Sequence, residues 1–286
     1  MEGDREARSK EGVGRLNFAL LPIFLALGAF VGFLAGLLGI GGGFTIVPVL
    51  TEVFTHEGFA REHLLPMAIG TSAASIIFTA FASARAHHAR GAVAWPVVWV
   101  MAPGLVLGSL LGPQIASALP APILAGFFGA FIWFGAYRQL RNVPPKADRE
   151  LPGKPGMFAG GAVIGLVAGM VGTGGAFLAV PFMTRCNVKL HTAVATSAAI
   201  GMPVAAAATI GYVVAGLRKT GLPPYSLGYV YLPALVAIVV TSTLLAPVGA
   251  RVAHAMPVAR LRYAFAAMLF ALGAYMWWKA YHLYGV

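Results

Sequence analysis

Two glycine-rich segments have the composition best suited to chemistry in this sequence. Residues 39–43 read GIGGG, and residues 172–175 read GTGG. Glycine inside a helix costs about 1 kcal/mol relative to alanine, so both runs predict interruptions rather than continuous helices. A helix that restarts at Phe44 or Phe177 would direct unpaired N–H groups and the positive end of its dipole into the protein. Because such helix starts bind anions, the predicted chemistry is anion binding.

Two Thr-Ser pairs, Thr71-Ser72 and Thr196-Ser197, lie in two similar segments, AIGTSAAS at 68–75 and AVATSAAI at 193–200. Their hydroxyls could donate hydrogen bonds to an oxyanion, although serine and threonine in membrane helices also bond to helix carbonyls and neighbouring helices. Histidine changes charge near neutral pH, and His191 precedes the second segment, so it is the candidate coupling or gating residue. The predicted substrate-binding residues are Gly41, Gly42, Gly43, Phe44, Thr45, Thr71, Ser72, Thr173, Gly174, Gly175, Ala176, Thr196 and Ser197.

The acidic residues lie at 2, 4, 6, 11, 52, 57, 62, 148 and 150. Cation carriers and carboxylate proton relays need Asp or Glu inside the membrane, so this class of transporter is disfavoured. Only Glu52 is expected near membrane depth, where it would mark the end of a short helix.

The usual enzyme motifs are also missing. The glycine runs lack the Lys-Ser/Thr of a phosphate-binding loop and the strand–turn–helix context of a dinucleotide fingerprint. No metalloprotease or serine-hydrolase motif occurs, and the single cysteine, Cys186, excludes an internal disulfide or a multi-cysteine metal site. We therefore predict no enzyme activity, no cofactor and no metal.

The composition places these residues in a membrane. The 286 residues are 59% apolar and only 10% charged, with a mean hydropathy of +0.80, whereas soluble domains are about 25% charged. Nucleic-acid binding is excluded because the lysines and arginines behind the net charge of +11 lie in short hydrophilic connections. Lys279, beside Trp277 and Trp278, is expected to extend to the membrane interface. The uncharged runs, 16–51, 64–84, 91–137, 155–184, 192–217, 220–250 and 263–278, predict about eight to ten membrane elements in a multi-pass inner-membrane protein.

The chain is internally repeated. At an offset of 133, GFLAGLLGIGGGFTIVPVL (32–50) matches GLVAGMVGTGGAFLAVPFM (165–183), and the two Thr-Ser segments follow in the same order. Duplicated halves are typical of secondary transporters. The expected organisation is a polar tail at 1–15, a first transmembrane repeat at 16–140, a hydrophilic linker at 141–156 and a second repeat at 157–286. The Gly-xxx-Gly spacings Gly32/Gly36 and Gly165/Gly169 are equally compatible with close helix packing alone.

Length predicts how each glycine run is built into the membrane. Residues 18–55 as one helix would be about 57 Å long, nearly twice the hydrocarbon thickness, so a broken hairpin fits better. The predicted fold class is an all-α integral membrane protein with two repeats, each a broken Gly-rich helical hairpin plus about three transmembrane helices. With that count the halves are inverted and the linker is cytoplasmic. If each broken region were a single pass, the halves would be parallel, and the Lys/Arg distribution mildly favours that alternative.

The paired glycine-proline segments and the Thr-Ser segments resemble the TauE/SafE family of sulfite exporters, also called the toluene sulfonate uptake permease family. The resemblance extends from about residue 18 to the end of the chain. It implies transport of sulfite, sulfonates or related sulfur-containing anions across the inner membrane, while substrate and direction differ among members. One departure is Ala176, which stands where the first run has Gly43, so the two helix starts need not be equivalent.

The leading hypothesis is a secondary transporter that moves a small sulfur-containing anion, sulfite or an organosulfonate, by alternating access. Its expected partners are that anion and the lipid bilayer, and a homo-oligomer stays open. An anion channel whose filter is formed by the glycine runs is the first alternative. The second is a membrane scaffold that transports nothing.

Overall fold

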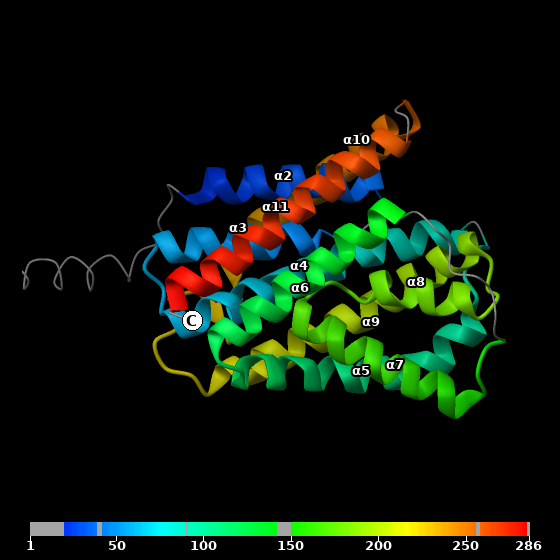
Figure 1. Ribbon diagram of the computed structural model, residues 1–286, viewed down its shortest axis with the longest axis horizontal. Helices are drawn as coiled ribbons and strands as arrows, with labels where there is room; N and C mark the ends of the chain where they lie inside the picture. The colour runs from blue at the N-terminus through cyan, green and yellow to red at the C-terminus, as the bar shows by residue number, and fades with distance from the viewer. Residues whose placement is uncertain (1–19, 39–41, 90, 142–149, 256–257, 285–286) are drawn as a thin grey trace, which may run out of the picture.

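The computed structural model describes residues 20–38, 42–89, 91–141, 150–255 and 258–284 (Figure 1). Within these residues the chain forms ten helices and one pair of short strands. The predicted all-α class is therefore confirmed. In chain order the elements are α2 (Leu21–Leu38), α3 (Gly43–His56), α4 (Arg61–Ala89), α5 (Trp95–Ala118), α6 (Ala121–Arg141), α7 (Lys154–Val171), α8 (Ala176–Arg185), α9 (Leu190–Leu217), β1 (Ser226–Leu227), β2 (Val230–Tyr231), α10 (Leu232–Ala255) and α11 (Val258–Tyr284).

Six of the described helices are long and apolar enough to cross a membrane, namely α4, α5, α6, α7, α9 and a segment of α10. Large apolar side chains such as Trp99 and Leu244 are exposed on the outer helices, whereas α4 is the most buried span. Apolar residues both inside and outside the bundle are expected when the surrounding solvent is lipid. The multi-pass membrane prediction is thus confirmed.

Two pairs of helices pack so closely that glycine backbones touch the partner helix. On α5, Gly104, Gly108 and Gly112 face Phe158, Ala162 and Leu166 of α7 in turn. Residue numbers rise together on the two helices, so α5 and α7 run parallel. The same holds for α2 and α10, where Gly28 meets Ile238 and Gly32 meets Ser242.

The Gly-xxx-Gly prediction is explained by these interfaces. A Cβ atom added at Gly169 would lie 2.9 Å from the carbonyl oxygen of Ser109, and Gly165 and Gly32 leave equally little room. Small residues allow this backbone approach, which compensates for the absence of a hydrophobic driving force between helices in lipid. In addition, Ser109 Oγ donates a hydrogen bond to the Gly165 carbonyl at 3.1 Å. The side-chain surroundings of Gly36 lie outside the described residues.

The other two closely packed pairs, α4 with α9 and α6 with α11, are antiparallel. Gly70 of α4 meets Tyr212 of α9, and Ala80 farther along α4 meets Gly201 earlier in α9. On α6 and α11, Gly129 faces Trp277 and Gly273 faces Trp133. Every one of the four tight pairs therefore joins a helix of the first half to a helix of the second.

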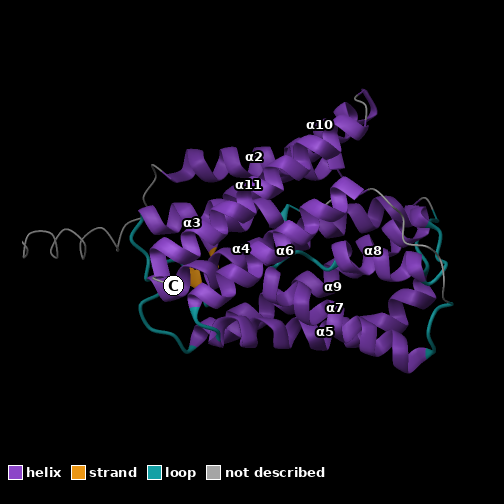
Figure 2. Cartoon of the chain, viewed as in Figure 1, coloured by secondary structure: helices purple, strands orange, loops and turns teal. Residues whose placement is uncertain are grey.

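A short antiparallel strand pair, β1–β2, was not predicted and precedes α10 (Figure 2). The uncharged run 220–250 predicts a membrane element that begins near residue 220. The structure begins α10 only at Leu232, because Pro223 and Pro224 cannot continue a helix and Tyr225 has a positive φ of 64°.

The glycine interfaces should be sensitive to a single added methyl group. We expect Gly108→Ala to lower the thermal unfolding temperature, because its Cβ would overlap the Ala162 backbone, and overpacking costs about 1–3 kcal/mol. Gly126→Ala is the matched control, since its Cβ would lie 3.6 Å from the Trp277 ring. Unfolding of the detergent-purified variants, followed by size-exclusion chromatography after heating, measures the difference. Equal unfolding temperatures would contradict the packing assignment.

Candidate functional site

The second glycine run interrupts the helical chain as its composition predicts. Helix α7 ends at Val171, and α8 begins at Ala176. Between them Gly172, Gly174 and Gly175 have φ values of 66°, 69° and 77°, a left-handed conformation that only glycine adopts at little cost. Gly175 precedes α8 without a side-chain cap. The first turn of α8 therefore presents backbone N–H groups that no side chain caps.

The first glycine run also separates two helices, α2 and α3. Gly42 is the residue before α3, in a right-handed conformation, and it too provides no side-chain cap. Gly41 lies outside the described residues. The conformations at Gly42 and Gly175 therefore differ, which agrees with the expectation that the two helix starts are not equivalent.

The two interruptions meet. A Cβ added at Gly43 would lie 2.5 Å from the carbonyl oxygen of Gly172 and 3.3 Å from Ser72 Oγ. Ser72, fully buried on α4, donates a hydrogen bond to the same Gly172 carbonyl at 3.3 Å. From this point α3 and α8 extend toward opposite ends of the bundle (Figure 1). Residues far apart in the sequence thus form one cluster, defined here as the break site: Gly42, Gly43, Ser72, Gly172, Gly174 and Gly175.

Phenylalanine rings cover the break site. Phe44 and Phe177 are the second residues of α3 and α8, and their ring centroids are 5.3 Å apart. Phe131 of α6 lies 5.7 Å from Phe44 and 5.8 Å from Phe177, and Phe134 lies 5.9 Å from Phe177. Of these rings only Phe44 was predicted. The aromatic sequence FFGAFIWF in α6 was a usable signal, but helical periodicity alone could not show which rings face the glycines.

The four hydroxyl residues of the two Thr-Ser pairs make different hydrogen bonds. Thr71 Oγ1 accepts a hydrogen bond from the backbone N–H of Tyr231 at 3.0 Å, and Thr196 Oγ1 accepts one from Ala94 N–H at 3.0 Å. Each threonine therefore holds the residue just before a helix start, that of α10 or that of α5. Ser197 donates to Val194 O within its own helix at 3.0 Å, so Ser72 alone among the four is shown bonded to the break site.

The remaining predicted residues divide between core and surface. Thr45 and Thr173 are buried, and Ala176 opens α8 in a half-buried position. His191 is exposed in the first turn of α9. Its predicted coupling role would have to be carried out from the surface.

Sequence reasoning missed a charge cluster between α3 and α11 that contains a buried lysine. Lys279 Nζ lies 2.6 Å from Glu52 Oε2 and donates to the Thr51 carbonyl at 3.3 Å, while Tyr275 also donates to Glu52. His56 Nε2 lies 3.0 Å from the other Glu52 oxygen. The Lys279 residue is only 3% exposed, so the expectation that it extends to the interface is wrong. A carboxylate partner within reach replaces the hydration that the ammonium group loses on burial.

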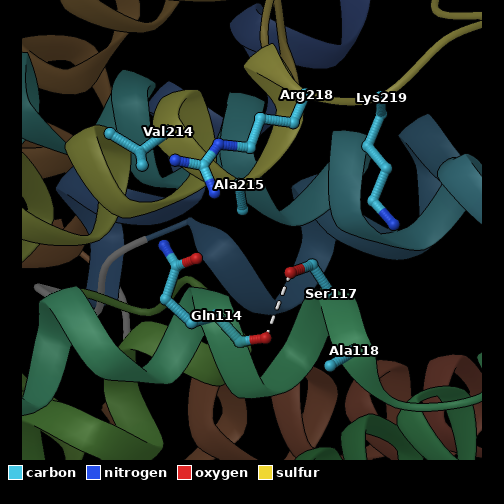
Figure 3. A pocket seen from close by; sticks show the side chains of 7 residues that line it. All are labelled: Gln114, Ser117, Ala118, Val214, Ala215, Arg218 and Lys219. Atoms are coloured by element: carbon cyan, nitrogen blue, oxygen red, sulfur yellow. Dashed lines mark hydrogen bonds between the residues drawn. The ribbon is translucent and has the colours of Figure 1, made fainter.

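A solvent-accessible pocket of about 400 Å³ lies elsewhere, where α5 and α9 end. Arg218, Lys219, Gln114 and Ser117 contribute its polar side chains (Figure 3). None of the predicted site residues lines it, so it is separate from the break site.

Comparison with known proteins identifies the family. The model of the family "Sulfite exporter TauE/SafE" matches residues 24–276. This chain belongs to the TauE/SafE family. A probable membrane transporter protein from Haemophilus influenzae is 32% identical over 92% of this chain and all of its own length. Probable membrane transporter proteins from Methanocaldococcus jannaschii (25% identical, 90% of this chain, 95% of the relative) and Bacillus subtilis (24%, 79% and 88%) are also similar. No solved structure matches the chain.

Membership confirms the family resemblance and the membrane localisation. TauE/SafE proteins are membrane transporters, so a small-molecule substrate and a lipid bilayer are the partners that follow, and no catalytic activity is indicated. The break site is the part of this TauE/SafE protein in which both glycine runs, one from each half, contribute backbone to a single place.

The Glu52–Lys279 pair predicts unequal effects of two substitutions. Glu52→Ala leaves a buried ammonium group without its carboxylate, and removing one partner of a buried pair is strongly destabilising. Lys279→Met removes the buried charge and leaves Glu52, whose side chain is 43% exposed, in contact with water. We expect a clearly lower unfolding temperature for Glu52→Ala than for Lys279→Met, measured in detergent. The reverse order would contradict burial of Lys279.

Proposed function

We propose that this TauE/SafE protein is a secondary transporter that moves sulfite or an organosulfonate across the inner membrane by alternating access. The anion binds at the break site, where the starts of α3 and α8 lie together. The observation that carries the proposal is the contact of the Phe44 and Phe177 rings, whose centroids are 5.3 Å apart, because these are the second residues of α3 and α8 and so bring two uncapped helix starts close together. Two positive dipole ends facing one place favour a negatively charged ligand.

The proposal includes inverted repeats with the predicted boundaries, 16–140 and 157–286. Helix directions support it. α4 and α9 contain the two Thr-Ser segments and are antiparallel, and the last helices of the halves, α6 and α11, are antiparallel too. Equivalent helices that run in opposite directions are what an axis in the membrane plane produces. Thr71 and Thr196, at matching positions, each accept a bond from the residue before α10 or α5.

An open anion channel is less favoured by the same geometry. A filter conducts through a water-filled path, whereas the rings of Phe44, Phe131 and Phe177 lie within contact of one another beside the glycines. Access to the break site then requires these rings to separate, as expected for a carrier that exposes its site to one side at a time.

Flux into proteoliposomes tests the function directly. Purified protein should take up sulfite or one of a small panel of organosulfonates with saturable kinetics, and unlabelled anion inside should accelerate entry of labelled anion. Saturation with counterflow supports a carrier. Flux without counterflow supports the channel, and no flux of any sulfur-containing anion overturns the proposal.

The double variant Gly42→Ala/Gly175→Ala should abolish anion binding at the break site while the protein still inserts into the membrane. Alanine at Gly175 is strained because of the positive φ, and at Gly42 its Cβ would displace Val31. Both changes disturb the helix starts. Equilibrium binding of sulfite to monodisperse protein measures the loss, with Gly126→Ala as control. Unchanged affinity would exclude the break site.

Threonine substitutions separate a binding role from a structural one. Thr71→Val removes the acceptor of the Tyr231 N–H, and an unsatisfied buried donor costs about 1–3 kcal/mol. The sequence prediction is that Thr71→Val and Thr196→Val weaken binding without abolishing it. Thr71→Ser and Thr196→Ser keep the hydroxyl and should restore the wild-type behaviour. A lower unfolding temperature with unchanged anion affinity would show that the hydroxyls serve the fold alone.

A further inference from the structure

Two arginines end the helices α6 and α8 near the linker, and Phe177 relates them, because Arg138 lies over its ring and Arg185 ends the same helix. Arg138 is in the last turn of α6, and Arg185 ends α8. Arg138 is partly desolvated, and the positive charge of Arg185 is close enough to repel its guanidinium group. Within the described part of the chain, every salt bridge involves Glu52 or Glu62, so no described carboxylate forms a salt bridge with either arginine.

The Arg138 guanidinium is held against the aromatic cover of the break site. Its Cζ lies 5.8 Å from the centre of the Phe177 ring and 6.0 Å from that of Phe134. Stacking on aromatic faces orients the planar fork of an arginine, but it supplies no counter-charge. A bound anion would lower the electrostatic energy of a half-buried cation that a second cation repels. Phe177 is also the second residue of α8, so one ring separates Arg138 from the helix start.

The other end of the bundle shows the contrasting arrangement. Glu52 lies ten residues after Gly42, and Arg185 lies ten residues after Gly175, so the two occupy matching positions in the repeat. Glu52 is paired with Lys279 of α11, which neutralises that position. At the matching position of the second half the charge is positive, and the neighbouring charge on α6 is positive as well. At this position of the repeat the charge is therefore positive only in the second half.

We propose that Arg138 and Arg185 form an outer anion site, which binds the sulfonate or sulfite group before the group passes the phenylalanine rings to the break site. An arginine fork matches two oxygens of such a group, and the exposed Arg185 adds a second charge from the adjacent helix end. The identity of the anion and the passage to the break site rest on the proposed function, whereas binding of an oxyanion by the two arginines does not.

The test uses Arg138→Gln, Arg138→Lys and Arg185→Gln, with Arg141→Gln as the matched control. Arg141 is in the same last turn of α6, and its guanidinium lies 5.2 Å from the centre of the Tyr137 ring, so the control also removes a charge that stacks on an aromatic ring. Sulfite and methanesulfonate are offered to proteoliposomes in which protein orientation has been determined. Initial rates are recorded against anion concentration on each side.

We expect Arg138→Gln to raise the half-saturating concentration about tenfold or more on the linker side, with the maximal rate changed far less. Arg138→Lys should recover part of the loss, Arg185→Gln should show a smaller rise, and Arg141→Gln should stay within about twofold of wild type. An equal rise in Arg141→Gln would mean general surface attraction and overturn the site. An unchanged Arg138→Gln, or a fall in maximal rate alone, would overturn it too.

Equilibrium binding distinguishes failure of this site from failure of the proposed function. If the wild type moves no anion, sulfite binding to the detergent-purified protein is measured by calorimetry. Binding that Arg138→Gln abolishes and Arg141→Gln retains supports the outer site even without transport. In Gly42→Ala/Gly175→Ala, which loses binding at the break site, any sulfite binding that remains should be abolished by adding Arg138→Gln. Absence of sulfite and methanesulfonate binding to the wild type overturns the proposal.

Discussion

Inside a membrane a helix can be interrupted only where protein, rather than lipid, surrounds the freed backbone groups. That constraint organises this molecule. Two interruptions are brought together, so that the carbonyl of Gly172 meets Gly43 and Ser72 of the other half. The rings of Phe44 and Phe177 lie against each other at the two uncapped helix starts. The long helices around them provide the enclosure that makes the interruptions tolerable.

The enclosure is built from contacts between the halves. α5 packs along α7 and α10 along α2 through glycines, and α4 with α9 and α6 with α11 are the other two closely packed pairs. The long helices before the glycine runs, α2 and α7, find their closest partners in the other half, whereas α3 and α8 after the runs pack mainly on α4 and α9 of their own half. The break site itself joins the two halves, because Gly43 meets Gly172. Formation of the break site is therefore coupled to assembly of the complete chain.

The sequence predicted the features that depend on local physics. Apolar runs located the membrane helices, and the cost of consecutive glycines located the interruptions, as Gly172, Gly174 and Gly175 show by their positive φ. Features that depend on the approach of distant segments were missed. Phe131, Phe134 and Arg138 of α6 contact Phe177 at the start of α8, and no spacing within α6 indicates what it faces. Lys279 was misjudged for the same reason, since its partner Glu52 is on a helix far away in the sequence.

Because helices of one half pack on helices of the other, the sequence repeats differ from the groups of helices that must move together. The two sequence repeats lie on either side of the linker. The backbone contacts at Gly108 and Gly165 nevertheless join α5 of the first repeat to α7 of the second. Helices in backbone contact have no side-chain layer to absorb relative displacement, so α5 and α7 must move together, as must α2 and α10. Each rigid body in a conformational change therefore contains helices from both halves. A hinge between the two repeats would not describe such a motion.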